Sequence, residues 1–264
     1  MTNNGTVIIS DAKVFKPPYI VPKQSANTLF HFIKELDYLL QALEKISLVP
    51  RYCIEPVEYL EIGFNNIAFP MICFCDINLH KIDDHMVRYG GYGIAFGKEW
   101  GIEKGIQPIQ YLNEYSHLKN DFSKAFNAAI NSEDSNEAQN FLLSQMYYFK
   151  PIAGDSKIDE ITKQKNFTDE CEWRFIPAVE ADRLPPILIN PEILERETLN
   201  KALIYAPNSW LNFSVGDIKY LILQNRSDVD EVTSLILEKN LFDTASMHIL
   251  LSKIIIWNES KGDF

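Results

Sequence analysis

The chain has 264 residues, of which 46% are apolar and 23% are charged, as is typical of a folded globular protein. Its formal net charge of -11 excludes indiscriminate coating of nucleic acid, because a phosphate backbone requires a positive field. No run approaches the roughly 20 apolar residues that cross a bilayer, and the polar start does not resemble a signal peptide, so we expect a cytoplasmic protein whose four cysteines are free thiols.

The first predicted elements follow a polar extension. We expect residues 1–27 to precede a single domain formed by residues 28–264, because no Gly/Ser-rich or Pro-rich linker divides the rest of the chain. Residues 29–33 predict a strand. Apolar residues at helical spacing between Leu36 and Ile46 predict a helix directly after it.

The middle of the chain predicts further strands. Residues 68–77 are almost continuously apolar, which is typical of a buried strand. A polar loop that contains His80 and His85 follows. Residues 92–96 predict another strand, and residues 109–112 a further short one.

The second half mixes helices and strands without strict alternation, which favours an α+β fold over a doubly wound parallel sheet. The predicted elements are amphipathic helices at 118–130 and 138–149, a polar loop at 150–170, strands at 172–179 and 218–223, a helix capped by Ser227 with Val229, Val232, Leu235 and Ile236 on one face, a helical start at 241, and a last strand at 253–257.

Four segments carry a family resemblance. They are Leu-Phe-His-Phe at 29–32, Pro-Met-Ile-Cys-Phe-Cys-Asp-Ile at 70–77, His85 followed by Tyr-Gly-Gly-Tyr-Gly-Ile-Ala-Phe at 89–96 and Lys-Glu-Trp at 98–100, and Glu-Cys-Glu-Trp-Arg-Phe at 170–175. Over roughly residues 25–180, this series resembles the AbiGi family of abortive-infection proteins. The resemblance implies the antitoxin half of a phage-defence pair whose toxin resembles a nucleotidyltransferase, and therefore a cognate toxin or antitoxin as partner.

A second resemblance concerns chemistry. His31, the tyrosine segment at 89–96, and the pair Glu170 and Glu172 follow the order of the three-part signature of ADP-ribosyltransferases. The opening strand and helix also look like the start of DarT-type enzymes, which modify DNA. This resemblance implies a split, mostly antiparallel sheet with packed helices, and NAD as co-substrate.

The resemblance assigns a role to each of these side chains. His31 would hold the ribose of NAD, and the ring of Tyr92 or Tyr89 would stack on the nicotinamide. Glu172 would stabilise the charge that develops on the ribose, and Glu170 would position or deprotonate the acceptor. As an alternative, His31, Tyr89 and Tyr92 could be core residues whose polar atoms are hydrogen-bonded within the protein.

Ion pairs are the alternative explanation for the charged candidates. Arg51 could pair with the pyrophosphate of NAD, or with Glu55. Glu172 could form a pair on the sheet with Arg174 or Arg51, and Glu170 could be a solvated loop charge.

Cys73, Cys75, His80 and His85 form a separate pattern that could be read as a zinc site, because Cys73 and Cys75 share one face of a strand. Their spacing matches no known zinc ribbon or finger, and buried free thiols are the commoner outcome. We expect no metal.

The sequence therefore predicts an anti-phage toxin–antitoxin component that transfers ADP-ribose from NAD to a nucleic acid or a protein. One alternative is a non-catalytic antitoxin or sensor that binds a partner toxin. Another is an NAD hydrolase, in which water replaces the acceptor. The acceptor, and the choice between toxin and antitoxin, stay open at this point.

Overall fold

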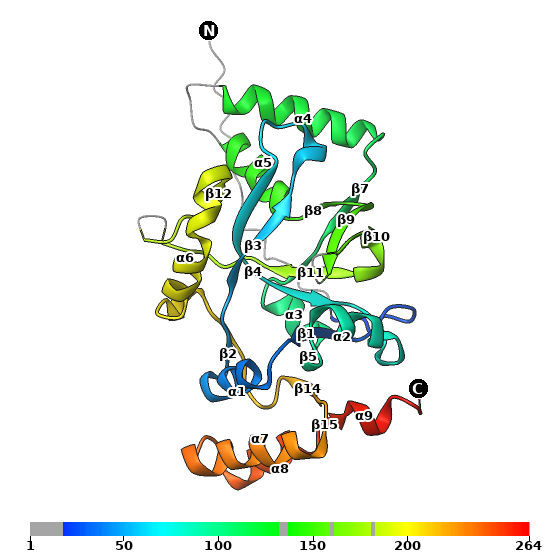
Figure 1. Ribbon diagram of the computed structural model, residues 1–264, viewed down its shortest axis with the longest axis vertical. Helices are drawn as coiled ribbons and strands as arrows, with labels where there is room; N and C mark the ends of the chain where they lie inside the picture. The colour runs from blue at the N-terminus through cyan, green and yellow to red at the C-terminus, as the bar shows by residue number, and fades with distance from the viewer. Residues whose placement is uncertain (1–17, 132–136, 159–160, 181–182, 264) are drawn as a thin grey trace.

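The computed structural model describes residues 18–131, 137–158, 161–180 and 183–263 (Figure 1). The strands are β1 (Thr28–Ile33), β2 (Ser47–Leu48), β3 (Arg51–Pro56), β4 (Asn66–Cys75), β5 (Tyr92–Gly97), β6 (Gln107–Pro108), β7 (Gln110–Leu112), β8 (Phe149–Pro151), β9 (Ala153–Ile158), β10 (Ile161–Asn166), β11 (Glu172–Phe175), β12 (Leu188–Ile189), β13 (Leu211–Asn212), β14 (Ile218–Leu223) and β15 (Ile254–Ile256).

Helices lie between these strands and confirm the predicted α+β class. The α-helices are α1 (Leu36–Lys45), α2 (Asp83–Tyr89), α3 (Lys98–Glu103), α4 (His117–Ile130), α5 (Glu137–Tyr147), α6 (Arg196–Leu203), α7 (Arg226–Lys239), α8 (Thr244–Leu251) and α9 (Trp257–Ser260). The 3-10 turns are η1 (Glu58–Leu60), η2 (Leu79–Lys81), η3 (Phe167–Glu170), η4 (Asn190–Glu195) and η5 (Pro207–Ser209). No helix among the described residues combines the length and apolar character that a bilayer requires of a spanning segment.

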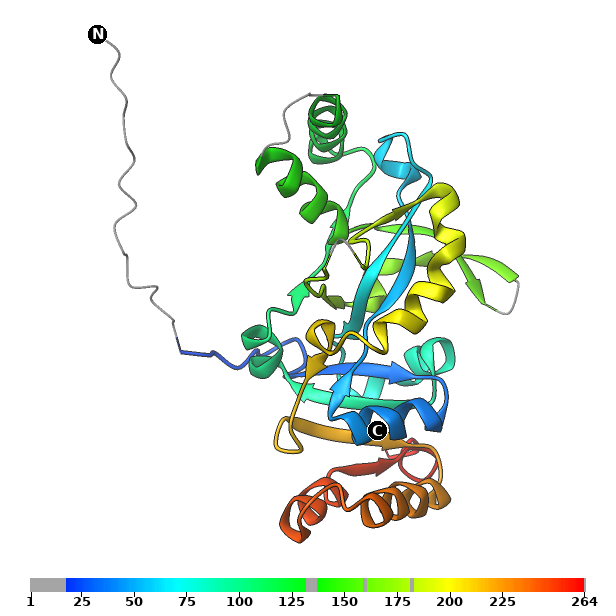
Figure 2. The same cartoon turned by 90° about the vertical axis from the view of Figure 1, so that its left-hand side faces the viewer.

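The main sheet runs in the order β15-β14-β5-β1-β4-β11-β6, and its pairs are antiparallel except β14 with β15. β4 also pairs with β3 and β12, so one long strand belongs to both halves of the molecule. Figure 2 shows α4 and α5 at one end of the molecule and α7 and α8 at the opposite end.

The sheet divides along β4. β3 pairs with β4 between Asn66 and Met71, whereas β1 pairs with it at Cys75. β1 and β3 diverge between these two pairings, and we call the opening between them the fork. Because both strands are fixed to the same rigid neighbour, the side chains that border the fork are held by regular structure on both sides.

Each half of the molecule has its own large apolar cluster. The larger packs the sheet against α1 and α7, through residues such as Leu29, Ile94, Leu221, Leu39 and Val232. The second packs β3 and β4 against α4, α5 and β8, and its members include Leu60, Phe69, Phe122, Phe126 and Phe149. The fork lies between these two packed regions.

The strongly patterned segments were predicted correctly. The apolar run at 68–77 is β4, the Gly-containing segment at 92–96 is β5, and the helical spacing after residue 36 is α1. Each of these segments buries one face or both, so apolar spacing alone identifies it.

Three predictions were wrong in detail. Residues 150–170 are not a loop: they form β8, the hairpin β9–β10 and η3. The hairpin is polar on both faces, so it lacks the alternation that marks a half-buried strand. The N-cap of α7 is Asn225 rather than Ser227, and the Asp228 carboxylate accepts the Asn225 backbone N–H at 2.8 Å. The strand expected to continue to residue 179 ends at Phe175.

Gly90 connects α2 to β5 and presses against β1. Its φ of +132° lies in a region that other residues rarely adopt. A Cβ built on Gly90 would lie 2.1 Å from the carbonyl oxygen of Ile33. This close approach fixes the end of α2, and with it Tyr89, beside the end of β1.

Replacing Gly90 with alanine should therefore destabilise the fold by about 3 kcal/mol, because strain from positive φ adds to a backbone clash. Gly105→Ala is the matched control, since Gly105 also has positive φ (+75°) but its Cβ would meet nothing within 4 Å. We expect the control to lose only about 1 kcal/mol in urea unfolding. Equal losses in the two variants would show that Gly90 does not clamp α2 to β1.

Candidate functional site

The fork contains two adjoining chambers. The inner chamber has a volume of about 290 Å³ and is lined by Phe30, His31, Phe32, Cys53, Glu55, Met71, Cys73, Phe74, Cys75, His85, Tyr89, Lys150, Glu170 and Glu172. The outer chamber has a volume of about 520 Å³ and is lined by His31, Phe32, Ile33, Lys34, Tyr38, Gln41, Ala42, Lys45, Ser47, Leu48, Val49, Pro50, Arg51, Tyr89, Glu197, Asn200, Lys201 and Ile204. His31, Phe32 and Tyr89 border both chambers, so the two form one cleft.

His31 joins β1 to β4 where the fork opens. Its Nδ1 lies 2.8 Å from the carbonyl oxygen of Cys73, on the stretch of β4 between the β3 and β1 pairings. Because a carbonyl oxygen only accepts, Nδ1 carries the proton and the neutral ring keeps Nε2 as an acceptor. Burial lowers the pKa of His31, and its bond to Cys73 only partly opposes this effect. His31 is thus a neutral imidazole with a fixed tautomer at the junction of the two chambers.

Glu172 is held on the wall of the inner chamber by two cations. The Arg174 Nε donates to one of its carboxylate oxygens at 2.7 Å, and the Lys150 Nζ to the other at 2.8 Å. Burial would raise the pKa of Glu172, but the charges of Arg174 and Lys150 hold that pKa well below its usual range. The carboxylate is therefore ionised although the side chain is 7% exposed.

Glu170 faces the same chamber and shares Lys150 with Glu172. The Lys150 Nζ lies 2.6 Å from Glu170. Burial would raise the pKa of Glu170, yet the adjacent Lys150 ammonium lowers it. Lys165 and the hydroxyl of Tyr89 also bond to the Glu170 carboxylate.

A single backbone conformation brings Glu170 and Glu172 to the same chamber. Cys171, between them, has a φ of +42°, which non-glycine residues adopt uncommonly. This left-handed residue caps the end of η3 and directly precedes β11. Two carboxylates that are two residues apart in sequence thereby share Lys150.

The ion pairs continue across the inner chamber to β3. The Arg174 side chain is completely buried, and it donates to Glu55 at 2.9 Å as well as to Glu172. Three carboxylates and three cations are therefore connected through successive ion pairs. We call this series the ionic chain; in order, it consists of Glu55, Arg174, Glu172, Lys150, Glu170 and Lys165. The predicted pair of Glu172 with Arg174 is confirmed, whereas Glu55 pairs with Arg174 rather than with Arg51.

The cleft brings together most of the candidates from sequence, but not all. Arg51 lines the outer chamber, and Tyr89 lines both chambers. Tyr92 lines neither, because it is paired with Ile33 on the face that packs against the larger core cluster, near Asp228 of α7. Of the two tyrosines proposed to stack on a ligand, the structure places only Tyr89 in the cleft.

Sequence reasoning missed the cations of the inner chamber. Lys150 and Lys165 fall in the segment that we expected to be a loop, so no pattern assigned them to a site. His85 took part in the family resemblance and in the zinc pattern, but it was assigned no role in the NAD site. It lines the inner chamber, is buried, and its Nε2 has no hydrogen-bond partner among the described residues.

The zinc interpretation finds no support in the described part of the chain. Cys73, Cys75 and His85 line the inner chamber, but His80 does not. No group of three or more His, Cys, Asp or Glu side chains among the described residues is arranged to hold a metal ion. Burial raises the pKa of Cys73 and of Cys75, so both thiols are protonated and act as apolar wall groups.

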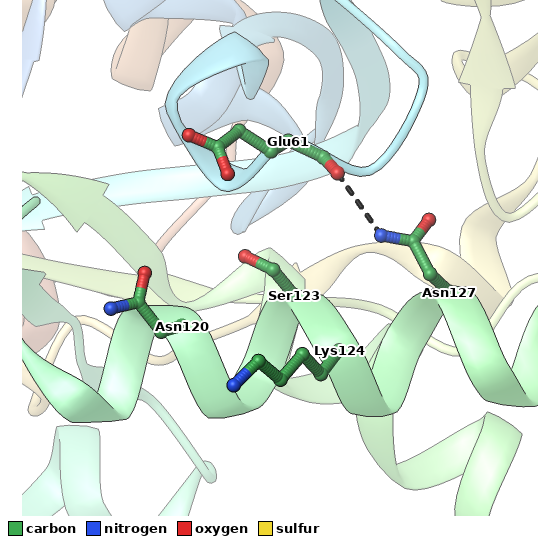
Figure 3. A pocket seen from close by; sticks show the side chains of 5 residues that line it. All are labelled: Glu61, Asn120, Ser123, Lys124 and Asn127. Carbon is green, nitrogen blue, oxygen red and sulfur yellow. Dashed lines mark hydrogen bonds between the residues drawn. The ribbon is translucent and has the colours of Figure 1, made fainter.

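A separate hollow of about 560 Å³ lies between α4 and the turn after η1 (Figure 3). The Asn127 amide donates to the Glu61 carbonyl at 3.1 Å, and the Ser123 hydroxyl donates to the Leu60 carbonyl at 2.5 Å. These polar groups join α4 to the turn. The hollow lacks the buried charges and unpaired polar atoms of the fork, so we place the candidate site in the fork.

Comparison with known proteins gives two matches. Residues 46–224 match the model of a family described as "abortive phage resistance protein AbiGi, antitoxin". The chain is 34% identical over 249 residues to the abortive phage resistance protein AbiGi of Lactococcus lactis subsp. cremoris, and the match covers 83% of this chain and 100% of the relative. No solved structure matches the chain.

Replacing Arg174 with methionine should destabilise the fold by about 3–5 kcal/mol, because the partly buried Glu55 loses its cationic partner and the buried Glu172 keeps only Lys150. Arg226→Met is the matched control. Its guanidinium pairs with Glu259 but is 77% exposed, so its loss should cost less than about 1 kcal/mol. Denaturant unfolding at neutral pH measures both values, and an Arg174 variant as stable as the control would contradict the role of the ionic chain.

Proposed function

The chain belongs to the AbiGi family of abortive phage resistance proteins, and on that premise we propose that it acts as an ADP-ribosyltransferase that uses NAD. The observation that carries this proposal is the position of His31 and Tyr89, which border both chambers of one cleft. A cationic outer chamber and a carboxylate-lined inner chamber then meet at these two rings. A split antiparallel sheet with packed helices, the arrangement that the ADP-ribosyltransferase resemblance implies, is consistent with this proposal.

The residues present fit a dinucleotide. Asn200 lines the outer chamber, and its Nδ2 is buried without a partner among the described residues while its Oδ1 accepts the Tyr52 backbone N–H at 2.7 Å. The amide orientation is thereby fixed, with a donor left for an anionic ligand. Arg51 precedes Tyr52 and supplies a guanidinium in the same wall. This pair of donors suits a pyrophosphate.

The inner chamber suits the reacting end of the ligand. NAD, when bound, supplies the ADP-ribosyl group through cleavage of its bond between nicotinamide and ribose. His31 Nε2 is the acceptor for a ribose hydroxyl, and the ring of Tyr89 is an apolar face against which a pyridinium ring can stack. Glu172 provides a fixed negative charge that stabilises positive charge developing on the ribose.

Glu170 is the candidate base in this proposal. Its carboxylate is ionised and reaches the inner chamber. An acceptor hydroxyl or amine that forms a bond to the ribose carbon must lose a proton, and Glu170 can take it. Lys150 and Lys165 hold this carboxylate in place through their ion pairs.

A second candidate function is toxin neutralisation by contact. Two observations favour it. The matching family model is described as an antitoxin, and both inner carboxylates already have cationic partners, as expected for a purely structural ionic chain. In this case the acidic chain, with a net charge of -11, would dock on a basic partner.

Glu172→Gln separates the two functions. In the enzyme, loss of the fixed charge should slow nicotinamide release from NAD by about 10²–10³-fold and abolish phage protection. Glu259→Gln, which alters an exposed ion pair far from the fork, is the control and should behave like wild type.

His31→Asn is a second variant that tests the site without changing the ionic chain, in case Glu172→Gln loses function through misfolding. The asparagine amide can still donate to the Cys73 carbonyl, but it lacks Nε2, so the fold should persist while activity falls. If Glu172→Gln and His31→Asn fold and protect cells from phage as well as wild type does, the catalytic proposal is wrong and the contact function stands.

A further inference from the structure

The outer chamber carries more positive charge than a dinucleotide requires. Lys34, Lys45, Arg51 and Lys201 all line it, in a chain whose net charge is -11. None of the four makes an ion pair with a carboxylate of the described residues. The one carboxylate in the chamber wall, that of Glu197, already pairs with Arg196 at 2.9 Å. Four uncompensated cations in one cavity therefore face the same ligand space.

These cations divide by position. Arg51 begins β3 and lines the outer chamber together with Asn200, whose Nδ2 is unpaired among the described residues, and those two groups suit one pyrophosphate. Lys34 follows β1, Lys45 lies in the last turn of α1, and Lys201 lies on α6. Three lysines on the segments that flank the chamber thus remain after the dinucleotide is accounted for.

An aromatic ring accompanies the lysines. Tyr38 lies in the first turn of α1, lines the outer chamber, and is 53% exposed. Its hydroxyl makes no hydrogen bond with the described residues, and about half of the side chain is open to a ligand. Exposed aromatic rings beside a row of cations are the usual elements of single-strand binding: the cations hold the phosphates and the ring stacks on a base.

We propose that Lys34, Lys45, Lys201 and Tyr38 bind a single-stranded nucleic acid at the mouth of the outer chamber. The proposal deepens the proposed function, since it rests on that function for the conclusion that this strand is the acceptor of ADP-ribose. Binding of the strand itself requires no catalysis. A local site of this kind agrees with the acidic composition, because three lysines hold one short segment and leave the rest of the surface repulsive to phosphate.

Fluorescence anisotropy with the full chain and labelled 12-nucleotide single strands of DNA and RNA tests the proposal. With three phosphates neutralised, the logarithm of the association constant should fall against the logarithm of salt concentration with a slope of about -2. The double variant Lys34→Glu/Lys201→Glu should weaken binding by at least about tenfold and flatten that slope to about -0.7. Tyr38→Ala should weaken binding by about fivefold or more, with the salt slope unchanged.

Lys124→Glu is the control for charge reversal, because Lys124 lies on α4 beside the separate hollow and its reversal makes there the same change in charge as each single substitution of the double variant. It should bind the strand within twofold of wild type. A poly-aspartate peptide of similar length tests whether any polyanion is accepted. The proposal is overturned if wild type does not bind the strand, if Lys124→Glu weakens binding as much as the double variant does, or if poly-aspartate binds equally well.

Nicotinamide release from NAD, measured on the same proteins without any strand, keeps the two proposals apart. Strand binding that depends on Lys34 and Lys201, with no nicotinamide release, would support the binding site and defeat the enzymatic function. Nicotinamide release without strand binding would do the reverse, and would point to a protein acceptor or water.

Discussion

The pairing of buried Arg174 with Glu172 and Glu55 is the constraint on which the fork depends. Arg174 is completely buried, and a guanidinium removed from water is tolerated only when its charge and its donors are matched. Its two carboxylate partners come from β11 and β3, and both of them line the inner chamber. Lys150 extends the same pattern to Glu170. The ionic chain thus sets the separation of the strands and, at the same time, supplies the polar wall of the cleft.

This arrangement explains how ionised carboxylates persist in a half-closed chamber. Burial alone would favour the protonated acids, but Lys150 and Arg174 reverse that preference for Glu172. Fixed charges in a site of low dielectric constant act strongly on any charge that develops nearby. His31 complements them as a neutral group, because its bond to Cys73 directs the proton to Nδ1 and leaves an acceptor. In the proposed enzyme, the same ion pairs would then stabilise the fold and hold the catalytic carboxylates.

The sequence predicted those elements whose burial follows a simple period, such as β4, β5 and α1. It also placed His31, Glu170 and Glu172 in an order that the fold brings to one chamber. It could not reveal the ionic chain, because Lys150 and Lys165 come from segments that are polar on both faces and resemble a loop. Nor could it separate Tyr89 from Tyr92, since which ring faces the fork depends on the strand register of β5 against β1 and on the turn at Gly90.

The central claim is that the inner chamber receives the ribose of NAD between β1 and β11. A crystal structure of the wild-type chain with carba-NAD, an analogue whose glycosidic bond does not break, tests this most directly. The account predicts the nicotinamide-bearing ring within hydrogen-bond distance of Glu172 and His31, with the pyrophosphate beside Arg51. A ligand bound outside the fork, or a chamber that stays empty at saturating analogue, would contradict it.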